Sequence, residues 1–372
     1  MINKELNVLF YTNAYEKVSN GSARFAHLLL KESKNAGLEI RILTEEIAFE
    51  TSSVYKLELN IPKALRLFGQ FIRMWKYHQA AMRIRKEFDF DVLVYNNAII
   101  GLFSFLFFKK TVGMINDDNN AANSLMAVFK RKAKLNKRVI FYYVEYLACH
   151  ISRCIIVNSE YLKKNLLQHY HCRPLLFKVM NKGIEDNLIN CDRGEILKKK
   201  VAGSILFVKT DFVRGGLFTL IESLKDIGNK TTLSIVGPPL DHHEHLRKLL
   251  DETGVSFELF DYLPPDKIFE KMRQSEIFCV PSKLEAFGVA NLEAMALGCK
   301  IVSTNVGGIP EAVGGNRFAW LVETNTPIVL KEALKKALET PIENKIDDIT
   351  AHLSNFSSAK VVLKFKGILK TC

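Results

Sequence analysis

The chain reads Pro281-Ser282-Lys283-Leu284-Glu285-Ala286-Phe287-Gly288-Val289-Ala290-Asn291-Leu292-Glu293-Ala294-Met295-Ala296-Leu297-Gly298 where a predicted strand gives way to a predicted helix. The apolar segment 277–280 ends at a proline, which lacks the N–H that a strand interior needs. Good helix formers follow Gly288, and Gly298 stands where helices commonly end. A loop that leads into a helix presents unpaired N–H groups and a positive dipole end, so the stretch is a candidate anion site.

Two carboxylates lie eight residues apart in this stretch. Glu285 belongs to the predicted loop, and Glu293 follows about two helical turns later. Both can therefore face one cleft. A simpler interpretation is an acid near a helix N-terminus and one surface glutamate, and the pattern alone does not choose between the two.

Composition indicates a globular protein of two domains. The chain has 372 residues, of which 48% are hydrophobic and 25% charged. The longest apolar run, 98–108, is too short to cross a bilayer, and the first residues lack a signal-peptide layout. Seven cysteines without a CxxC pair predict reduced thiols of a cytoplasmic protein rather than a disulfide framework or a zinc site.

Positive charge is concentrated in the first half of the chain. Residues 1–200 contain 32 Lys and Arg against 19 Asp and Glu, whereas residues 201–372 contain 20 against 21. The segment 63–86 has seven basic residues, no acid and many aromatic and aliphatic residues, and 130–138 adds six basic residues. Such segments suit an anionic membrane surface. A solvated helix face and a nucleic acid are the alternatives, but no nucleic-acid-binding motif appears.

Predicted strands and helices alternate along the whole chain. Strands are expected at 6–11, 39–43, 92–95, 111–115, 154–157, 204–208, 232–236, 256–260, 277–280, 300–303 and 320–322. Helices are expected at 21–35, 63–88, 159–169, 216–224, 241–252, 266–274, 291–297, 328–339 and 357–370. This alternation predicts an α/β fold with parallel, doubly wound sheets, and the composition changes between 181 and 200.

These residues resemble the E-x7-E region of family-4 glycosyltransferases with the GT-B fold. The resemblance rests mainly on 281–298 followed by Gly307-Gly308-Ile309-Pro310-Glu311. Segments 155–159, 182–184, 207–224 and 235–237 agree with the family in order and spacing. The resemblance implies two Rossmann-like domains facing across a cleft, residues 1–185 on the acceptor side and 186–356 binding the nucleotide sugar. It also implies that the C-terminal helix 357–372 crosses back to the first domain.

The resemblance also implies site residues. Glu293 would bind the ribose hydroxyls, and Glu285 would lie beside the donor sugar. The backbone N–H groups of Phe287, Gly288 and Val289 would meet the sugar and diphosphate. A carboxylate can accept two hydroxyl donors, and a glycine lets a backbone approach a ligand closely, so the chemistry agrees.

The basic loop that follows 204–208 departs from the family pattern. Thr210 stands where relatives place an arginine, with Lys209 one residue before it, and Arg214 is the nearest match to the family lysine. A diphosphate leaving group needs fixed positive charge, which Arg214 can supply to two oxygens at once. Lys209 is either a second such group or a solvated lysine, because a shift of one residue on a strand reverses its face. Gly237, at the next strand end, is a further expected donor-binding residue.

Two positions in the first half are also expected at the donor. Gly21 replaces the glycine pair that the family tends to place before its first helix, and it could equally be a plain helix start. Asn116 stands where many relatives have the histidine of a His-Asp pair, which weakens the case for a general base there.

Two acidic or histidine clusters offer metal sites as alternatives. Asp117 and Asp118 could bind Mg²⁺ or Mn²⁺, but the preferred interpretation is that they cap a helix that begins near residue 120. His242, His243 and His245 do not converge well on one helix, so no metal is expected there.

The sequence therefore predicts a hexosyltransferase that moves a sugar from a UDP- or GDP-sugar to an acceptor hydroxyl, in surface polysaccharide, lipopolysaccharide or glycolipid synthesis. The resemblance implies retention at the anomeric carbon, with no metal or cofactor besides the co-substrate. Expected partners are a carbohydrate or lipid-linked acceptor and the inner face of the membrane. The departures at Thr210 and Asn116 keep a catalytically weak nucleotide-sugar-binding homologue open. The charge distribution keeps a basic membrane- or nucleic-acid-binding protein open.

Overall fold

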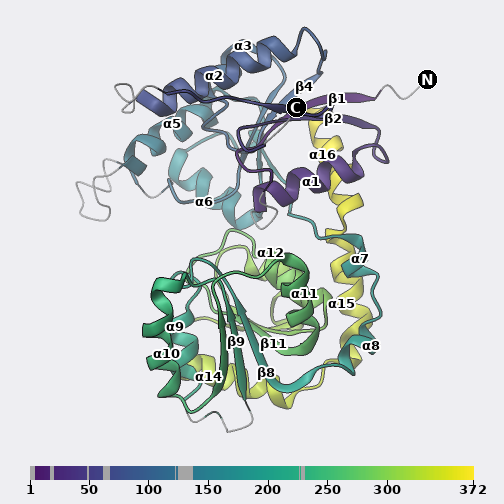
Figure 1. Ribbon diagram of the computed structural model, residues 1–372. Helices are drawn as coiled ribbons and strands as arrows, with labels where there is room; N and C mark the ends of the chain where they lie inside the picture. The colour runs from purple at the N-terminus through teal and green to yellow at the C-terminus, as the bar shows by residue number, and fades with distance from the viewer. Residues whose placement is uncertain are drawn as a thin grey trace. The chain divides into compact units, whose positions relative to one another are not determined.

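A computed structural model describes residues 5–16, 21–47, 50–61, 68–121, 123–124, 137–225, 227 and 231–372. The chain forms two compact units, which are coloured along the sequence in Figure 1. Unit 1 comprises Met1–Lys182 and Ser358–Cys372, and unit 2 comprises Gly183–Ser357. The chain thus leaves the first unit once and returns to it for its last helix.

Unit 1 is built on a seven-stranded parallel sheet. Its strands are β1 (Leu6–Tyr11), β2 (Leu38–Thr44), β3 (Val54–Lys56), β4 (Val92–Tyr95), β5 (Thr111–Ile115), β6 (Ile155–Val157) and β7 (Phe177–Val179). They lie in the order β3-β2-β1-β4-β5-β6-β7. The strands β4, β5 and β6 are buried throughout, as expected for apolar runs in a sheet covered by helices on both faces.

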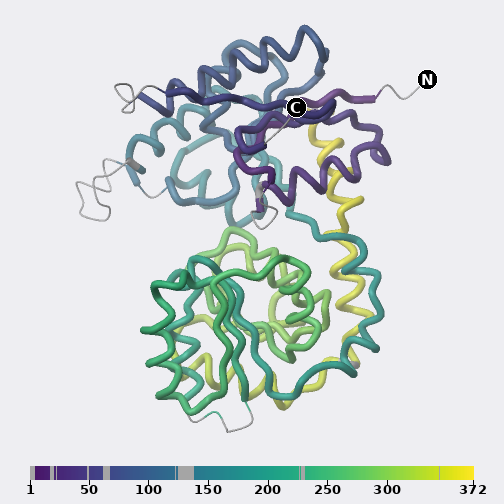
Figure 2. Tube along the Cα trace, viewed as in Figure 1, coloured from purple at the N-terminus to yellow at the C-terminus, as the bar shows by residue number. Residues whose placement is uncertain are grey.

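Helices from the two ends of the chain cover the same part of this sheet. The helices α1 (Gly21–Ser33) and α16 (Ser358–Thr371) lie side by side, as the purple and yellow segments of Figure 2 show. Phe10 of β1, Phe25 of α1 and Phe365 of α16 make edge-to-face ring contacts in the core between them. The other α-helices in the described part of unit 1 are α2 (Gly69–Ile84), α3 (Leu102–Phe107), α5 (Lys137–Ile151) and α6 (Glu160–Tyr170).

Unit 2 repeats the architecture with six parallel strands. They are β8 (Val201–Val208), β9 (Thr232–Val236), β10 (Ser256–Phe260), β11 (Ser275–Val280), β12 (Lys300–Thr304) and β13 (Ala319–Val322), in the order β10-β9-β8-β11-β12-β13. Figure 1 shows α9 (Leu217–Ser223), α10 (His243–Asp251) and α14 (Pro327–Glu339) on one side of the sheet and α11 (Pro265–Gln274) and α12 (Val289–Ala296) on the other. The described part of unit 2 also contains α7 (Asp186–Ile189), α8 (Arg193–Leu197), α13 (Ile309–Val313) and α15 (Ile346–Leu353). The predicted doubly wound fold is confirmed in both units.

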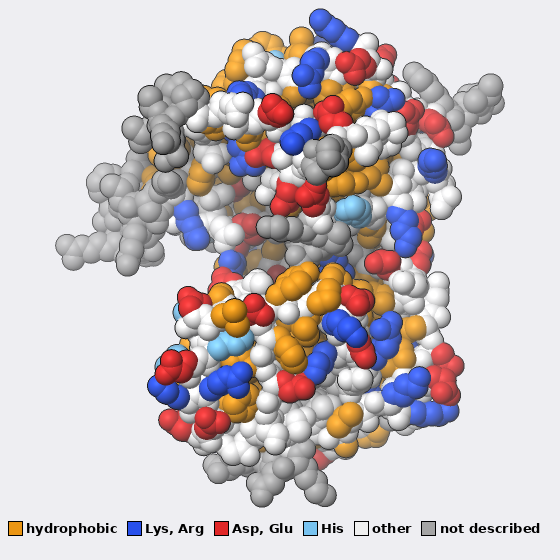
Figure 3. Space-filling model, viewed as in Figure 1, with side chains coloured by type: hydrophobic (Ala, Val, Ile, Leu, Met, Phe, Trp, Pro, Cys, Tyr) orange, Lys and Arg blue, Asp and Glu red, His pale blue; other side chains and the backbone are white. Residues whose placement is uncertain are grey.

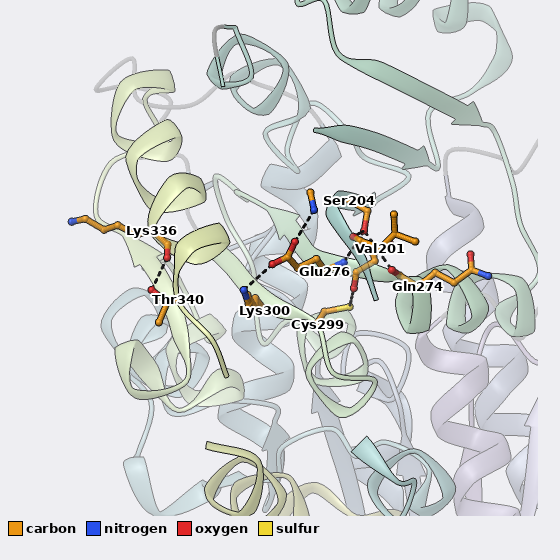
Figure 4. A network of polar contacts seen from close by, with 10 residues as sticks. Val201, Ser204, Gln274, Glu276, Cys299, Lys300, Lys336 and Thr340 are labelled. Atoms are coloured by element: carbon orange, nitrogen blue, oxygen red, sulfur yellow. Dashed lines mark hydrogen bonds and ion pairs between the residues drawn. The ribbon is translucent and has the colours of Figure 1, made fainter. Parts of the chain in front are cut away.

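The amino ends of the central strands of unit 2 are joined by one glutamate (Figure 4). Glu276 of β11 accepts hydrogen bonds from the backbone N–H of Gly203 at 2.7 Å and from Lys300 Nζ at 2.8 Å. Its own N–H donates to the hydroxyl of Ser204 at 2.9 Å. Because three neighbouring strands are tied at this end, their opposite, carboxyl ends are held in register for a site.

Two expectations from the sequence are wrong. Cys154 and Cys372 form a disulfide within unit 1, although the odd number and wide spacing of the cysteines predicted only free thiols. The fold brings β6 and the end of α16 together, which no local pattern could indicate. Residues 119–121 form a turn, so no helix begins at residue 120, where Asp117 and Asp118 were expected to cap one, and residues 122 and 125–136 lie outside the described residues.

The two basic segments are described in part. Residues 63–67 and 130–136 lie outside the described residues, whereas α2 and α5 contain most of the remainder. Within the described part of the chain, no helix is both long and apolar enough to cross a membrane.

Candidate functional site

The predicted E-x7-E stretch lies at the point where the strand order of the second sheet reverses. Chain order runs outward from β8 to β9 and β10 on one side, and from β11 to β12 and β13 on the other. Loops that leave β8 and β11 therefore diverge to opposite faces of the sheet. In open α/β sheets this point, at the carboxyl ends of the strands, is where ligands bind.

An ion pair links these two loops. Lys209 directly follows β8, and its ammonium group contacts the carboxylate of Glu285, which lies in the loop after β11. Both side chains are about a quarter exposed, so the pair is partly shielded from water. The side chain of Lys209 is therefore directed at the predicted donor site, where a solvated position had been the alternative.

Arg214 belongs to the same loop as Lys209 and is held by backbone contacts. Its N–H donates to Asp211 Oδ1 at 3.1 Å, and its carbonyl accepts from the N–H of Lys283 at 2.8 Å. The second bond ties the loop after β8 to the loop after β11. The arginine is half-buried, and this tie holds its backbone at the switch point.

Glycines make the close approach of these loops possible. Gly288 precedes α12 with φ of 92°, a conformation that suits glycine. A Cβ on Gly307 would lie 1.7 Å from the carbonyl oxygen of Glu285, so no other residue fits there. The neighbouring Gly308 donates its N–H to that same carbonyl at 3.0 Å. Gly307 and Gly308, the glycine pair of the sequence motif, therefore pack against the backbone of Glu285 and hold its loop in position.

The other predicted residues of unit 2 lie on or beside this site. Glu293 lies in α12 and is only 3% exposed. Val289 is the first residue of α12, and the buried ring of Phe287 packs 5.8 Å from that of Phe356. Gly237 follows β9, and a Cβ there would lie 2.5 Å from the backbone of Lys209. Position 237 therefore requires glycine, because any side chain there would collide with the backbone of the basic loop.

The two predicted residues of unit 1 lie at the start of a helix and directly after a strand of the first sheet. Gly21 is the first residue of α1, and a Cβ there would meet nothing within 4 Å, so no close approach explains it within the fold. Asn116 follows β5, and its Nδ2 donates to the carbonyl and the side-chain oxygen of Asn96 at 2.8 and 3.0 Å. It is therefore part of a polar network at the carboxyl edge of the first sheet.

The clusters weighed as metal sites have protein partners. Asp118 accepts hydrogen bonds from Tyr161 and Asn165, at 3.2 and 2.7 Å. The ring of His243 contacts the carbonyl of Pro238 at 2.9 Å. Among the residues that the structure describes, no three His, Cys, Asp or Glu side chains are arranged to hold a metal ion.

Several residues at the carboxyl edges were missed by sequence reasoning. Asn96, Asn158 and Asn181 join Asn116 in one hydrogen-bonded row, and Asn325 donates to the carbonyl of Pro281 at 2.8 Å. The sequence could have indicated this row, because each of its asparagines comes one or two residues after a strand of the first sheet.

Two family models match consecutive parts of the chain. A model described as Glycosyltransferase Family 4 matches residues 19–188, and one described as Glycosyl transferases group 1 matches residues 192–350. A D-inositol 3-phosphate glycosyltransferase of Corynebacterium efficiens is 27% identical over 235 residues. That match spans 58% of this chain and only 55% of the relative.

Solved structures of similar fold cover nearly the whole chain. A glycosyltransferase from Rickettsia africae superposes with a TM-score of 0.72 at 18% identity, covering 99% of this chain and 100% of that one. Anabaena Alr3699/HepE in complex with UDP and glucose gives 0.69 at 14% identity, with the same coverage. At these identities the structures show a common GT-B fold. The two family models, which between them match most of the chain, establish that it belongs to glycosyltransferase family 4.

Proposed function

We propose that this protein transfers a hexose from a nucleoside diphosphate sugar to an acceptor hydroxyl, with retention of the anomeric configuration. The nucleotide sugar, with UDP or GDP, is the co-substrate, and the reaction needs no resident metal or cofactor. The observation that carries the proposal is the convergence of Lys209, Glu285 and Arg214 at the switch point of the second sheet.

The charges at this point suit a sugar diphosphate. Glu285 offers acceptor oxygens for sugar hydroxyls, and Lys209 and Arg214 offer positive charge for the diphosphate. The N-terminus of α12, which begins at Val289, adds backbone N–H groups and a positive dipole end. Glu293, one turn into α12, supplies the carboxylate for the ribose hydroxyls. Because Lys209 pairs with Glu285, a bound donor has to share or replace this ion pair.

The proposed step forms a bond between the acceptor oxygen and the anomeric carbon while the bond from that carbon to the phosphate oxygen breaks. The acceptor proton passes to the departing phosphate oxygen on the same face of the sugar. Negative charge grows on the diphosphate, and Arg214, Lys209 and the amides of 287–289 stabilise it. Glu285 holds the sugar in position through its hydroxyls.

The similar proteins support this proposal. The relative from Corynebacterium is named as a glycosyltransferase acting at D-inositol 3-phosphate, and the Anabaena structure contains UDP and glucose. Family membership and fold make the same class of donor reasonable here. Synthesis of a surface polysaccharide, lipopolysaccharide or glycolipid is the setting that we propose for the product.

A panel of UDP-, GDP- and ADP-sugars tests the function. We expect one of them to raise the melting temperature and to be consumed with an acceptor, equally with and without a chelator. Glu285→Ala should lower kcat/KM by about 100-fold, as for loss of one stabilising group at a reacting centre. Glu258→Gln is the matched control, since Glu258 pairs with Lys271 on the same unit without facing the switch point.

The outcomes separate the alternatives. If no nucleotide stabilises the protein, the transferase proposal is wrong. Stabilisation without turnover by any acceptor in the panel would instead identify a nucleotide-sugar-binding homologue, as the residues at 116 and 210 allow.

We further propose that unit 1 meets an anionic membrane surface through α2, α3 and α5. Large apolar side chains are exposed on all three helices, among them Trp75, Phe107 and Ile140, at 44, 63 and 57%. The rings of Trp75 and Phe103 lie 5.6 Å apart, which joins α2 to α3. Figure 3 shows basic side chains beside hydrophobic ones over α2 and α3. Apolar and basic groups together are what an interfacial protein presents to anionic lipid.

Vesicle sedimentation tests this surface. We expect binding to vesicles with phosphatidylserine or phosphatidylglycerol, weaker binding to neutral vesicles, and a loss of binding in the double variant Trp75→Ser and Phe107→Ser. Ile328→Ser is the control, because Ile328 is 78% exposed but lies on unit 2. Equal binding by both variants would contradict the assignment, and so would equal binding to neutral vesicles.

A further inference from the structure

A row of asparagines crosses the carboxyl edge of the first sheet. Asn96, Asn116, Asn158 and Asn181 follow the neighbouring strands β4, β5, β6 and β7. Asn116 donates to the carbonyl of Asn96 at 2.8 Å, Asn158 donates to that of Asn116 at 2.9 Å, and Asn181 donates to that of Asn158 at 3.1 Å. We call these four residues the asparagine row.

The backbone fixes which way each amide points. A carbonyl oxygen can only accept, so the Nδ2 of Asn116, Asn158 and Asn181 must face the preceding residue. In Asn96, Oδ1 accepts from Asn116 Nδ2 at 3.0 Å, which leaves its own Nδ2 on the other side. The identity of the remaining amide atoms is thus determined by the row itself.

These remaining atoms are buried and lack protein partners. Asn116 Oδ1, Asn158 Oδ1 and Asn96 Nδ2 make no hydrogen bond to the protein, and the nearby Asp118 Oδ1 makes none either. Asn96, Asn158 and Asp118 are 3, 6 and 7% exposed. An unpaired buried polar atom costs about 1–3 kcal/mol, so four of them at one edge call for a ligand or water that satisfies them.

The loop that follows Asn116 is acidic, whereas Lys182 follows Asn181 at the end of the row. Asp117 and Asp118 directly follow Asn116, and Glu145 of α5 accepts from Asn120 of the same loop at 3.2 Å. Burial, with a smaller contribution from the charges of Asp117 and Asp118, raises the pKa of Glu145 to about 7. Asp117 and Asp118 place negative potential beside Asn116, which disfavours an anion there.

We propose that the asparagine row recognises the hydroxyl groups of a neutral, polyhydroxylated acceptor ring and discriminates against a phosphorylated one. Three of the four unpaired atoms are oxygens that require a donor, and the fourth is an N–H that requires an acceptor. Hydroxyl groups both donate and accept, so adjacent hydroxyls of a sugar or cyclitol can satisfy all of them. A phosphate offers only acceptors when fully ionised, and an ammonium group offers only donors.

The inference rests on the proposed function, in which unit 2 holds the charged donor and an acceptor is still to be assigned. It also separates this chain from the Corynebacterium relative, which is named for a phosphorylated inositol. The unpaired atoms are shielded in this structure, so binding of an acceptor to them requires that the side chains around them move.

Ligand-observed NMR on the full chain, with no donor present, tests the row. The probes are methyl α-D-glucopyranoside, myo-inositol and D-inositol 3-phosphate, the last two differing in one phosphate. We expect a neutral probe to bind at least about tenfold more tightly than the phosphorylated one. Tighter binding of the phosphorylated probe would overturn the inference, and so would the absence of binding by every probe, since water alone would then fill the row.

A pair of variants locates the binding. Asn158→Ala removes a buried unpaired oxygen and should weaken binding of the neutral probe about tenfold. Asn7→Ala is the control, because Asn7 Nδ2 also donates to a backbone carbonyl, that of Asp89 at 3.2 Å, but lies near the amino end of β1, so binding should be kept.

The donor is measured separately. Nucleotide-sugar stabilisation of the Asn158→Ala variant should equal that of the parent, which also shows that the variant is folded. If Asn158→Ala weakens only the nucleotide sugar, the row serves the donor and the inference fails while the proposed function stands. If no nucleotide sugar binds the parent but the neutral probe does, the proposed function fails while the row remains a polyol site.

Discussion

The two parallel sheets have the same architecture, but their carboxyl edges present different side chains. In unit 2 the edge presents charged groups, with Lys209 paired to Glu285 and Arg214 held beside them. In unit 1 the central edge presents amides, linked from Asn96 to Asn181. A parallel sheet supplies equivalent strand ends, and the residue after each strand decides what they bind. A charged edge suits a diphosphate, whereas an amide edge suits hydroxyl groups.

Placing a charge on the amide edge should have the largest effect. Asn96→Asp keeps the oxygen that accepts from Asn116 but buries a second, unpaired oxygen with a negative charge. We expect a loss of about 3–5 kcal/mol in the free energy of unfolding at pH 7, measured by urea denaturation. Asn97→Asp is the control, because Asn97 is exposed and its Oδ1 bond to the N–H of Ile99 survives the change. If Asn96→Asp lowers the free energy of unfolding no more than Asn97→Asp does, the amide edge tolerates a charge.

Removing charge from the other edge should affect activity more than stability. Lys209→Met keeps the length of the side chain and removes the ammonium group beside Glu285. We expect kcat to fall by about 10²–10³-fold with a small change in melting temperature. Lys271→Met, which breaks the Glu258 ion pair, should leave kcat unchanged. An unaltered kcat in Lys209→Met would mean that this lysine only orders the loop.

The buried carboxyl group of Glu145, close to the amide edge, should make the stability of unit 1 depend on pH. The pKa of Glu145 is raised from 4.5 to about 7, chiefly by burial. The folded state therefore retains a proton that the unfolded state loses, and this stabilisation is present at low pH and lost as the pH rises through about 7. The advantage of the parent over Glu145→Gln should fall by about 2–3 kcal/mol between pH 5 and 8.

Urea denaturation at several pH values measures this difference. Glu195→Gln is the control, because Glu195 is an exposed partner of Lys198. A parent and Glu145→Gln variant with parallel pH profiles would contradict a buried, proton-binding Glu145.

The units also differ in their cysteines. Removing the disulfide of unit 1 should have the smallest of the four expected effects. Unit 1 has the Cys154–Cys372 disulfide, whereas Cys191, Cys279 and Cys299 of unit 2 are free. Cys372→Ser should cost about 2 kcal/mol under oxidising conditions, at the lower end of what disulfides usually contribute by restricting the unfolded chain. Cys191→Ser should cost less, and dithiothreitol should abolish the difference between the parent and Cys372→Ser. A parent that is insensitive to the reductant would indicate free thiols at both positions.

Much of the fold could be predicted because each strand is a short apolar run between turn residues. The strands at 6–11, 92–95, 111–115, 232–236 and 256–260 have the expected bounds. Short elements at the margins were missed, including β3 and β7, which have three residues each. The helix α3 reads Leu-Phe-Ser-Phe-Leu-Phe, and an apolar run of this kind has no period that separates a helix from a strand.

The site was predicted less evenly than the fold. Glu285, Arg214 and Lys209 were named from a motif, and the structure places all three at one strand-order reversal. Asn96 and Asn158 were not named, because an asparagine after a strand is a common turn residue. Only the parallel register of β4, β5 and β6 turns these turn residues into a row.

By itself the sequence determined the alternation of strands and helices, the glycines around Glu285 and the uneven distribution of charge. These are local properties, since apolar runs, helix formers and positive-φ positions act over a few residues. Tertiary structure alone decided that Lys209 meets Glu285 across 76 residues, that Cys154 meets Cys372 across 218, and that four asparagines align. Such contacts depend on strand order and register, which are settled only when both faces of each sheet are buried.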